Sequence, residues 1–209
     1  MELLKTFRKC LLFVLLLGTG ANLSAQNFQA TAAAFKASYK FEELKEYTKA
    51  VSALKTVYDE KSYELNLRLG WLTYLAGTQN ESLEYYRKAM SLKPYAIEPC
   101  LGFAYPASKL GLWNELLSVY NKALSIDPGN TAVNYAKGLL LYNRADFQSA
   151  EICFEKIVNL YPFDYDGLHM LAWTKLQLKK TSEARILFQK ALLNRPDNAS
   201  DTEGLSLIQ

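Results

Sequence analysis

The sequence predicts an all-α fold of repeated helical pairs, because three kinds of residue recur with one period of 34. The first kind is proline, at Pro94, Pro128, Pro162 and Pro196. The second is an aromatic residue eight positions before each proline, at Tyr86, Tyr120, Phe154 and Phe188. The third is a small residue 24 positions before each proline, at Gly70, Ala104, Gly138 and Ala172. A fixed period of this length is typical of stacked helix-turn-helix repeats.

Each period is consistent with two amphipathic helices joined by a short turn. The small residue falls in the first helix, where a larger side chain would hold the second helix away. In a helix interior Gly70 and Gly138 each cost about 1 kcal/mol relative to alanine, and close approach of the second helix offsets that cost. The proline ends the second helix, since it has no N–H to donate and its ring clashes with the preceding turn.

These positions resemble the tetratricopeptide repeat family, whose pattern has a small residue at position 8, an aromatic residue at 24, alanine at 27 and proline at 32. Four repeats match the pattern, at 63–96, 97–130, 131–164 and 165–198. A shorter repeat at about 31–62 precedes them, with Ser62 where proline is expected. The resemblance implies a right-handed α-solenoid of about five repeats over residues 26–198, followed by a short C-terminal tail at 199–209.

The chain departs from the family pattern at two places in its helices. No repeat has the family's tryptophan at position 4, where the residues are Asn66, Cys100, Asn134 and Leu168. Pro106 falls inside the first helix of repeat 97–130. An interior proline costs about 3 kcal/mol unless the helix bends or breaks, so we expect a kink near Tyr105 and Pro106.

The N-terminal residues have the pattern of a secretory signal peptide. Basic residues (Lys5, Arg8, Lys9) precede a short apolar run, and small residues follow it up to Ala25. This order is typical of a cleaved leader, and the run is far shorter than the roughly 20 residues of a membrane-spanning helix. We therefore expect cleavage after Ala25, no stable membrane span afterwards, and export to the periplasm or the extracellular space.

Charge and composition argue against several classes of function. The formal net charge is +3, and the expected leader carries part of it, so the sequence does not predict nucleic-acid binding. The only histidine, His169, has no histidine or cysteine at metal-ligand spacing, and neither a phosphate loop nor a nucleophile elbow is present. The sequence predicts no enzyme, no cofactor and no metal site. Cys100 and Cys153 lie in different repeats and are expected to be buried thiols.

In this family the first helix of each repeat lines a concave surface, and the resemblance assigns this role residue by residue. We call the assigned set the groove residues. They are Phe35, Tyr39, Leu67, Trp71, Tyr74, Tyr105, Tyr135, Tyr142, His169 and Trp173. Further positions of the same kind are occupied by Leu75, Leu101, Lys109, Leu139, Asn143, Asp166 and Gln177. The set is mainly aromatic, whereas relatives that clamp a peptide carboxylate use lysine and asparagine, so we do not expect a carboxylate clamp.

Three functions follow as hypotheses. The first is a non-enzymatic scaffold that binds a protein or peptide through the aromatic groove, because tyrosine and tryptophan are enriched among binding hot spots. The second is a glycan-binding module that uses the same rings. The third is a structural homo-oligomer formed through the repeat ends. The third rests on the tail, which is short and apolar at Leu205, Leu207 and Ile208 and predicts a poor capping helix.

Overall fold

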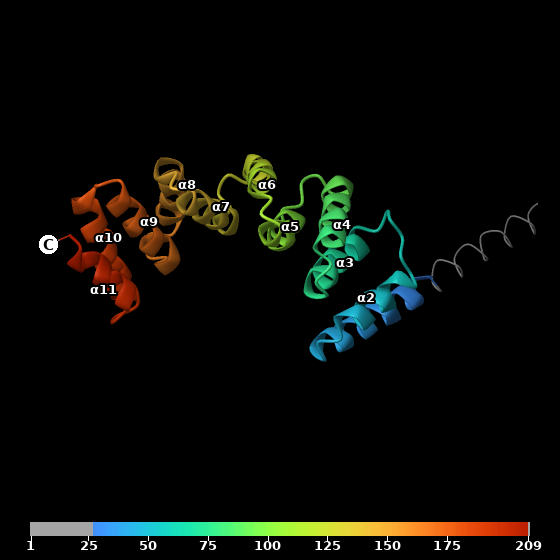
Figure 1. Cartoon of the computed structure of the whole chain (residues 1–209). Coiled ribbons are helices and arrows are strands. Elements are labelled where there is room, and N and C mark those ends of the chain that lie inside the picture. The colour runs from blue at the N-terminus through green and yellow to red at the C-terminus, as the bar shows by residue number, and fades with distance from the viewer. Residues whose placement is uncertain (1–26, 209) are drawn as a thin grey trace, which may run out of the picture. The chain divides into compact units, whose positions relative to one another are not determined.

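The computed structural model describes residues 27–208 (Figure 1). Among those residues every regular element is a helix, so the predicted all-α, α-solenoid fold is confirmed. None of the described helices is long and apolar enough to cross a membrane. The expected signal peptide, residues 1–25, lies outside the described part of the chain. The chain divides into an N-terminal unit, Met1–Lys93, and a C-terminal unit, Pro94–Gln209.

The N-terminal unit contains two helical pairs. A helix described over residues 27–43 precedes α2 (Tyr47–Lys55), and α3 (Tyr63–Leu75) precedes α4 (Gln79–Leu92). One cluster of buried side chains joins them, with α2 and α3 contributing most of it. Its members are Ala34, Ala50, Val51, Leu54, Leu65, Leu69, Leu72 and Tyr85.

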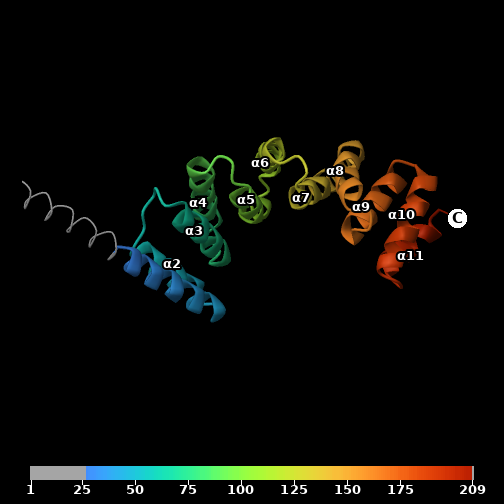
Figure 2. The ribbon, with the colours of Figure 1, turned by 180° about the vertical axis from the view of Figure 1, so that it is seen from behind.

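The C-terminal unit contains three helical pairs and one further helix, in chain order in both views of the ribbon (Figures 1 and 2). The pairs are α5 (Glu98–Lys109) with α6 (Trp113–Ile126), α7 (Thr131–Asn143) with α8 (Phe147–Leu160), and α9 (Tyr165–Gln177) with α10 (Thr181–Asn194). The last helix is α11 (Ala199–Ser206). The core of the C-terminal unit includes Phe154 and Ile157 of α8 and Phe188 of α10.

In two repeats the aromatic residue of the second helix packs against the small residue of the first helix. A Cβ atom placed on Gly70 would lie 3.0 Å from ring carbons of Tyr86, and one on Gly138 would lie 2.7 Å from ring carbons of Phe154. The rings therefore occupy the space that a side chain would need. This close contact offsets the poor helix propensity of glycine.

Helix N-caps recur with the same period as the prolines. Ser62, Asn130, Asp164 and Asn198 each accept a hydrogen bond from the backbone N–H three residues further on. Such a cap satisfies one of the N–H groups that the first turn leaves unpaired. At the corresponding start of α5 the cap residue is Ile97, which makes no such side-chain bond. The first helix of repeat 97–130 is thus the one in this series that begins without a side-chain cap.

Asparagine at position 4 has a structural role in two repeats. The buried amide of Asn66 donates to the backbone oxygens of Glu60 and Ser62. The amide of Asn134 donates in the same way to the oxygens of Pro128 and Asn130. Each amide ties the turn between two repeats to the helix that follows, in place of the family's tryptophan.

Helix α5 continues through Pro106, which lies buried inside it, so the proline does not end the helix. Proline removes one helical hydrogen bond, and buried packing of this segment compensates for that loss. The expected kink near Tyr105 and Pro106 stays a prediction, because a continuous helix can still bend. The expectation of a poor cap at the tail is wrong. The tail forms α11, from which Leu205, together with Ile208 just beyond it, packs against the cluster of Ala172, Ala184 and Phe188.

Both cysteines of the expected mature chain are buried. Burial raises the pKa of the Cys100 and Cys153 thiols, and nearby lysines offset this only in part. The two groups are therefore protonated thiols at neutral pH, as the sequence predicts.

The turns inside the repeats give a prediction about stability. Gly77, Gly111, Ala145 and Lys179 occupy equivalent positions in successive repeats, and all have positive φ, between 59° and 85°. Residues with a Cβ cost roughly 1–2 kcal/mol in this conformation. We expect Ala145→Gly and Lys179→Gly each to stabilise the fold by about 0.5–1 kcal/mol after the entropy cost of glycine, measured by urea denaturation.

The matched control for the turn substitutions is the reverse change at the other two positions. Gly77→Ala and Gly111→Ala should each destabilise the fold, because alanine disfavours a positive φ. A loss of stability in both Ala145→Gly and Lys179→Gly would contradict the assignment of strain to these turns.

The contact between Gly138 and Phe154 gives a second prediction. Gly138→Ala should destabilise the protein by about 1–3 kcal/mol through overpacking, although alanine is the better helix former. Phe154 is fully buried, so its ring cannot turn out into solvent without leaving the core. Gly70→Ala should cost less, since its contact is longer. In a Phe154→Leu background Gly138→Ala should lose most of its effect, and an unchanged cost there would exclude the ring as the cause.

Candidate partner-binding faces

In the N-terminal unit the groove residues come from two helices. Phe35 and Tyr39 lie on the helix at 27–43, and Leu67, Trp71 and Tyr74 lie on α3. The Tyr39 side chain is 53% exposed, and the other four are partly buried. Phe35 and Trp71 also pack against the core of the unit. The Trp71 and Tyr74 rings lie 5.7 Å apart between centroids. The structure therefore brings aromatic side chains of two neighbouring helices to a partly exposed surface.

Two charged residues fix the rings of this surface. Arg68 lies 3.9 Å above the centre of the Tyr39 ring, and it also pairs with Glu42 at 2.6 Å. Glu42 in turn accepts a hydrogen bond from the indole nitrogen of Trp71 at 2.6 Å. The sequence reasoning missed Glu42 and Arg68. Their effect is to orient the rings and to cover one face of Tyr39.

In the C-terminal unit the groove residues differ in exposure. Tyr105 of α5 is 51% exposed. Tyr135 and Tyr142 of α7 are partly buried and pack edge-on against Phe154 and Phe147, with centroids 6.0 Å and 5.2 Å apart. The edge-on packing leaves only part of each α7 ring accessible to a partner.

Helix α11 contacts the two groove residues of α9. The indole nitrogen of Trp173 donates to Ser200 Oγ at 3.1 Å, and His169 Nδ1 lies 2.6 Å from Asp201 Oδ1. Both side chains are partly buried. The tail therefore takes up polar contacts that a partner could otherwise make with His169 and Trp173.

Asp201 is the centre of the contact between α9 and α11. Its carboxylate is 0% exposed and accepts a second hydrogen bond, from the hydroxyl of Tyr165 at 3.0 Å. Burial, together with this bond and the negative charge of Asp201, raises the pKa of Tyr165 to about 12. The phenol is therefore protonated at neutral pH and acts as a donor. One sequence signal could have revealed this helix, namely Asn198, which continues the series of N-caps.

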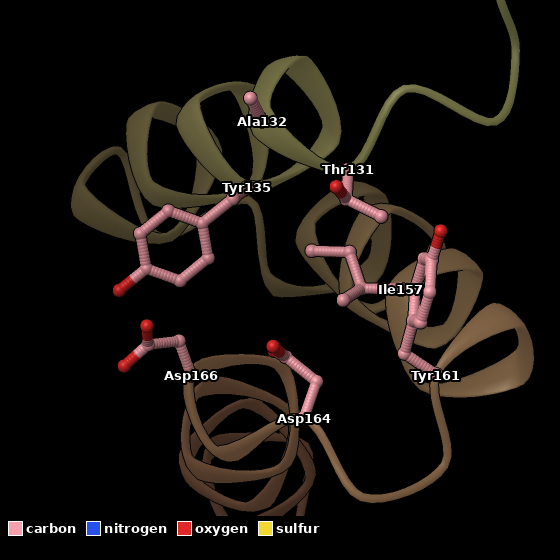
Figure 3. Close-up of a pocket in the computed structure, with 7 residues that line it drawn as sticks. All are labelled: Thr131, Ala132, Tyr135, Ile157, Tyr161, Asp164 and Asp166. Carbon is pink, nitrogen blue, oxygen red and sulfur yellow. The ribbon is translucent and has the colours of Figure 1, made fainter.

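An open pocket of about 400 Å³ lies between α7 and α9. Figure 3 shows Tyr135 and Asp166 facing each other across it, with Asp164 directed toward its interior. Thr131, Ala132, Ile157 and Tyr161 form the other walls. Burial, with the charges of Asp166 and Asp164, raises the pKa of Tyr135, while Arg195 opposes the shift. The pocket is thus both aromatic and negatively charged.

A larger pocket, of about 590 Å³, lies on the other side of α7. Its walls are mostly apolar, and Trp113, Leu116 and Tyr120 of α6 face Leu139 and Leu140 of α7. Asn143 also borders it. Four residues that the resemblance placed in the groove therefore border the pockets: Tyr135 and Asp166 line the polar one, and Leu139 and Asn143 line the apolar one.

A network of charged side chains joins α8, α9 and α10. The ammonium group of Lys175, nearly buried, contacts Glu151, Glu155 and Glu183, and Lys180 also binds Glu151. Burial alone would lower the pKa of Lys175, but the three carboxylates raise it. Burial alone would raise the pKa of Glu151, but the two lysines lower it. Both groups stay charged at neutral pH, so the network holds helices together and has no proton to exchange.

Among residues 27–208 no group of three or more histidine, cysteine, aspartate or glutamate side chains is placed to hold a metal ion. Two acidic residues with little exposure, Glu151 and Asp201, are both bound by cationic or hydroxyl groups of the chain itself.

Stacked helical pairs with open pockets beside a first helix define a repeat scaffold. A family model described as tetratricopeptide repeat matches residues 131–164 and 165–198. Among solved structures, a tetratricopeptide repeat protein from Parabacteroides merdae is similar with a TM-score of 0.74 and 22% identity, over 86% of this chain and 72% of that one. Residues 131–164 and 165–198 therefore match the tetratricopeptide repeat family, and the chain has a fold similar to that of its solved members.

Two further solved structures have the same fold. The protein MamA matches with a TM-score of 0.70 and 18% identity, over 79% of this chain and 92% of that one. YrrB, described as a tetratricopeptide repeat protein with an unusual peptide-binding site, matches with a TM-score of 0.69 and 14% identity, over 89% and 97%. The sequence has no match among curated proteins. Members of this family are generally non-enzymatic scaffolds for protein interaction, and this chain has the fold of such a scaffold.

The contact of α11 gives a third prediction. Asp201→Ala removes the acceptor of the Tyr165 hydroxyl and the partner of His169, and a buried donor left unsatisfied costs about 1–3 kcal/mol. We expect faster amide hydrogen exchange in α11 and the end of α10, with no change in α7. Thr202→Ala, an exposed change on the same helix, should leave exchange unaltered. Equal exchange in both variants would show that Asp201 does not hold the helix.

Proposed function

We propose that this protein is an exported, non-enzymatic scaffold that binds an extended segment of a protein partner along the first helices of its repeats. The observation that carries the proposal is the position of α7 between two pockets. Tyr135 borders the polar pocket, and Leu139 and Asn143 border the apolar one. A peptide that crosses α7 could place one side chain in each.

The chemistry of the surface supports a peptide as the ligand. Peptide recognition combines pockets for individual side chains with aromatic contact area, and both occur on α7. The fold shared with YrrB, which has a peptide-binding site, supports the same class of ligand.

Glycan binding is the alternative that the experiments must distinguish. Sugars stack on the open faces of aromatic rings. In the N-terminal unit Arg68 covers a face of Tyr39, and in the C-terminal unit Tyr142 packs against Phe147. These contacts reduce the ring area open to a sugar, which favours the peptide hypothesis.

Export is the second part of the proposal, and it rests on the leader pattern of residues 1–25. The expected mature chain begins at Gln26. The N-terminal sequence of the protein isolated from the envelope and from the culture medium of the producing cells tests this directly. A chain that begins at Met1 and remains in the cytoplasm would contradict it.

Blocking the two pockets gives a fourth prediction. Ala132 and Ser108 are exposed residues that border the polar and the apolar pocket. Ala132→Trp and Ser108→Trp should each fill a pocket without removing a core contact. We expect each variant to recover at least about tenfold less partner from an envelope extract than the parent, since a lost hot-spot contact costs about 2 kcal/mol or more.

The control for the pocket variants is Gln148→Trp, an equally large change at an exposed position of α8 outside both pockets. It should recover the partner as the parent does, with all four proteins matched in helicity and melting temperature. A partner retained by both pocket variants would move the binding site away from α7. Binding of an oligosaccharide without any protein partner would favour the glycan alternative.

A further inference from the structure

We infer that the polar pocket between α7 and α9 is a subsite for one positively charged side chain, arginine or lysine, of the bound peptide. This inference rests on the proposed function and names the residue type that the site would select. Its basis is the combination of carboxylates, tyrosine rings and apolar walls in one open pocket (Figure 3).

The carboxylates supply a negative charge that the chain balances only weakly. Asp166 has a cationic neighbour in Arg195, but the charged atoms are 3.9 Å apart and both side chains are 56% exposed. Exposed pairs of this kind contribute little binding energy. Asp164 uses Oδ1 to cap α9 by accepting from Gly167 N at 2.7 Å. A carboxylate has further acceptor capacity, so it can bind a cation as well.

The other walls suit the stem of a long cationic side chain. Lysine and arginine bury their methylene groups on apolar surface while the charged end stays in a polar environment. Ile157 and Ala132 provide such surface, and Tyr135 and Tyr161 provide rings over which a cation is attracted. The walls and the carboxylates together match both parts of such a residue.

An anion is the obvious competitor, because α7 and α9 both begin at this pocket and helix N-termini attract negative charge. Both ends are already capped by side chains of the chain. Asn130 accepts from Val133 N, and Asp164 accepts from Gly167 N. The charges of Asp164 and Asp166 would also repel an anion, so the pocket favours a cation.

The next repeat contains the corresponding site with a cation already in place. Tyr165 and Arg195 stand one repeat after Thr131 and Tyr161, the equivalent positions of the open pocket. The guanidinium group of Arg195 lies 3.8 Å above the centre of the Tyr165 ring. At Tyr165 the repeat geometry thus holds an arginine over a tyrosine ring. At the open pocket it presents tyrosine rings and carboxylates, and no arginine is among the lining residues.

The test uses three synthetic peptides that differ in one central residue, Ac-Gly-Ser-X-Ser-Gly-NH2 with X as arginine, citrulline or glutamate. Citrulline has nearly the shape of arginine and carries no charge. Titration into the ¹⁵N-labelled protein, followed by amide NMR, should show shifts at residues 131–135 and 161–166 for the arginine peptide. We expect the citrulline peptide to bind at least about fivefold more weakly, and the glutamate peptide to cause no shift there.

Two variants and a matched control locate the charge. Asp166→Asn should lower the affinity for the arginine peptide at least about threefold. Arg195→Ala should raise that affinity, because it removes a cation that competes for Asp166. Asp146→Asn changes the net charge equally, at the exposed N-cap of α8 outside the pocket, and keeps a capping residue there. It should leave the affinity unchanged.

The outcomes separate this inference from the proposed function. Equal binding of the arginine and citrulline peptides, or equal effects of Asp166→Asn and Asp146→Asn, would overturn the cationic subsite. If the envelope partner is still lost from the Ala132→Trp and Ser108→Trp variants, the scaffold proposal stands without it. Conversely, selective arginine binding with no envelope partner would support the subsite and count against the proposed function.

Discussion

The contact between a glycine in the first helix and an aromatic ring in the second determines much of this structure. At Gly138 the Phe154 ring fills the space that a Cβ would need, so the two helices of the repeat pack at one close separation. A close-packed interior resists changes of even one methyl group, which makes this separation a fixed quantity. The N-cap of the next helix and the positive-φ turn within the repeat follow at set distances along the chain. Together they decide which residues of α7 face the pockets.

The periodic part of the fold could be predicted from the sequence, because each periodic position does one local task. The small residue admits the ring, and the proline follows the second helix. The end of the C-terminal unit could not be predicted in the same way. Helix α11 depends on Asp201 reaching Tyr165 and His169, which belong to the preceding repeat, and no local pattern encodes that contact. Helix α5 likewise continues through Pro106 because buried packing outweighs a local preference.

The exposure of the groove residues likewise could not be predicted from the sequence. The family resemblance places Trp71, His169 and Trp173 on one kind of surface, but their accessibility depends on neighbours outside that pattern. Glu42 binds the indole of Trp71, and α11 supplies Ser200 and Asp201 to the two residues of α9. Aromatic rings at these positions are both part of the packing and candidates for binding. Pocket-filling substitutions beside α7 separate these roles better than removal of the rings.

The two equivalent sites in the C-terminal unit show how a repeat scaffold can acquire specificity. The backbone that positions Tyr161 beside Thr131 also positions Arg195 beside Tyr165, so the difference between the two sites lies only in side chains. Thr131, Tyr161 and Arg195 lie outside the periodic positions that define the repeat, whereas Tyr165 also belongs to the buried core. Arg195 occupies its site on Tyr165 from within the chain. At the equivalent site Tyr161 stands in place of arginine, and Arg195 pairs with Asp166 only across an exposed contact of 3.9 Å, which is why the proposed subsite for a partner's cation lies there.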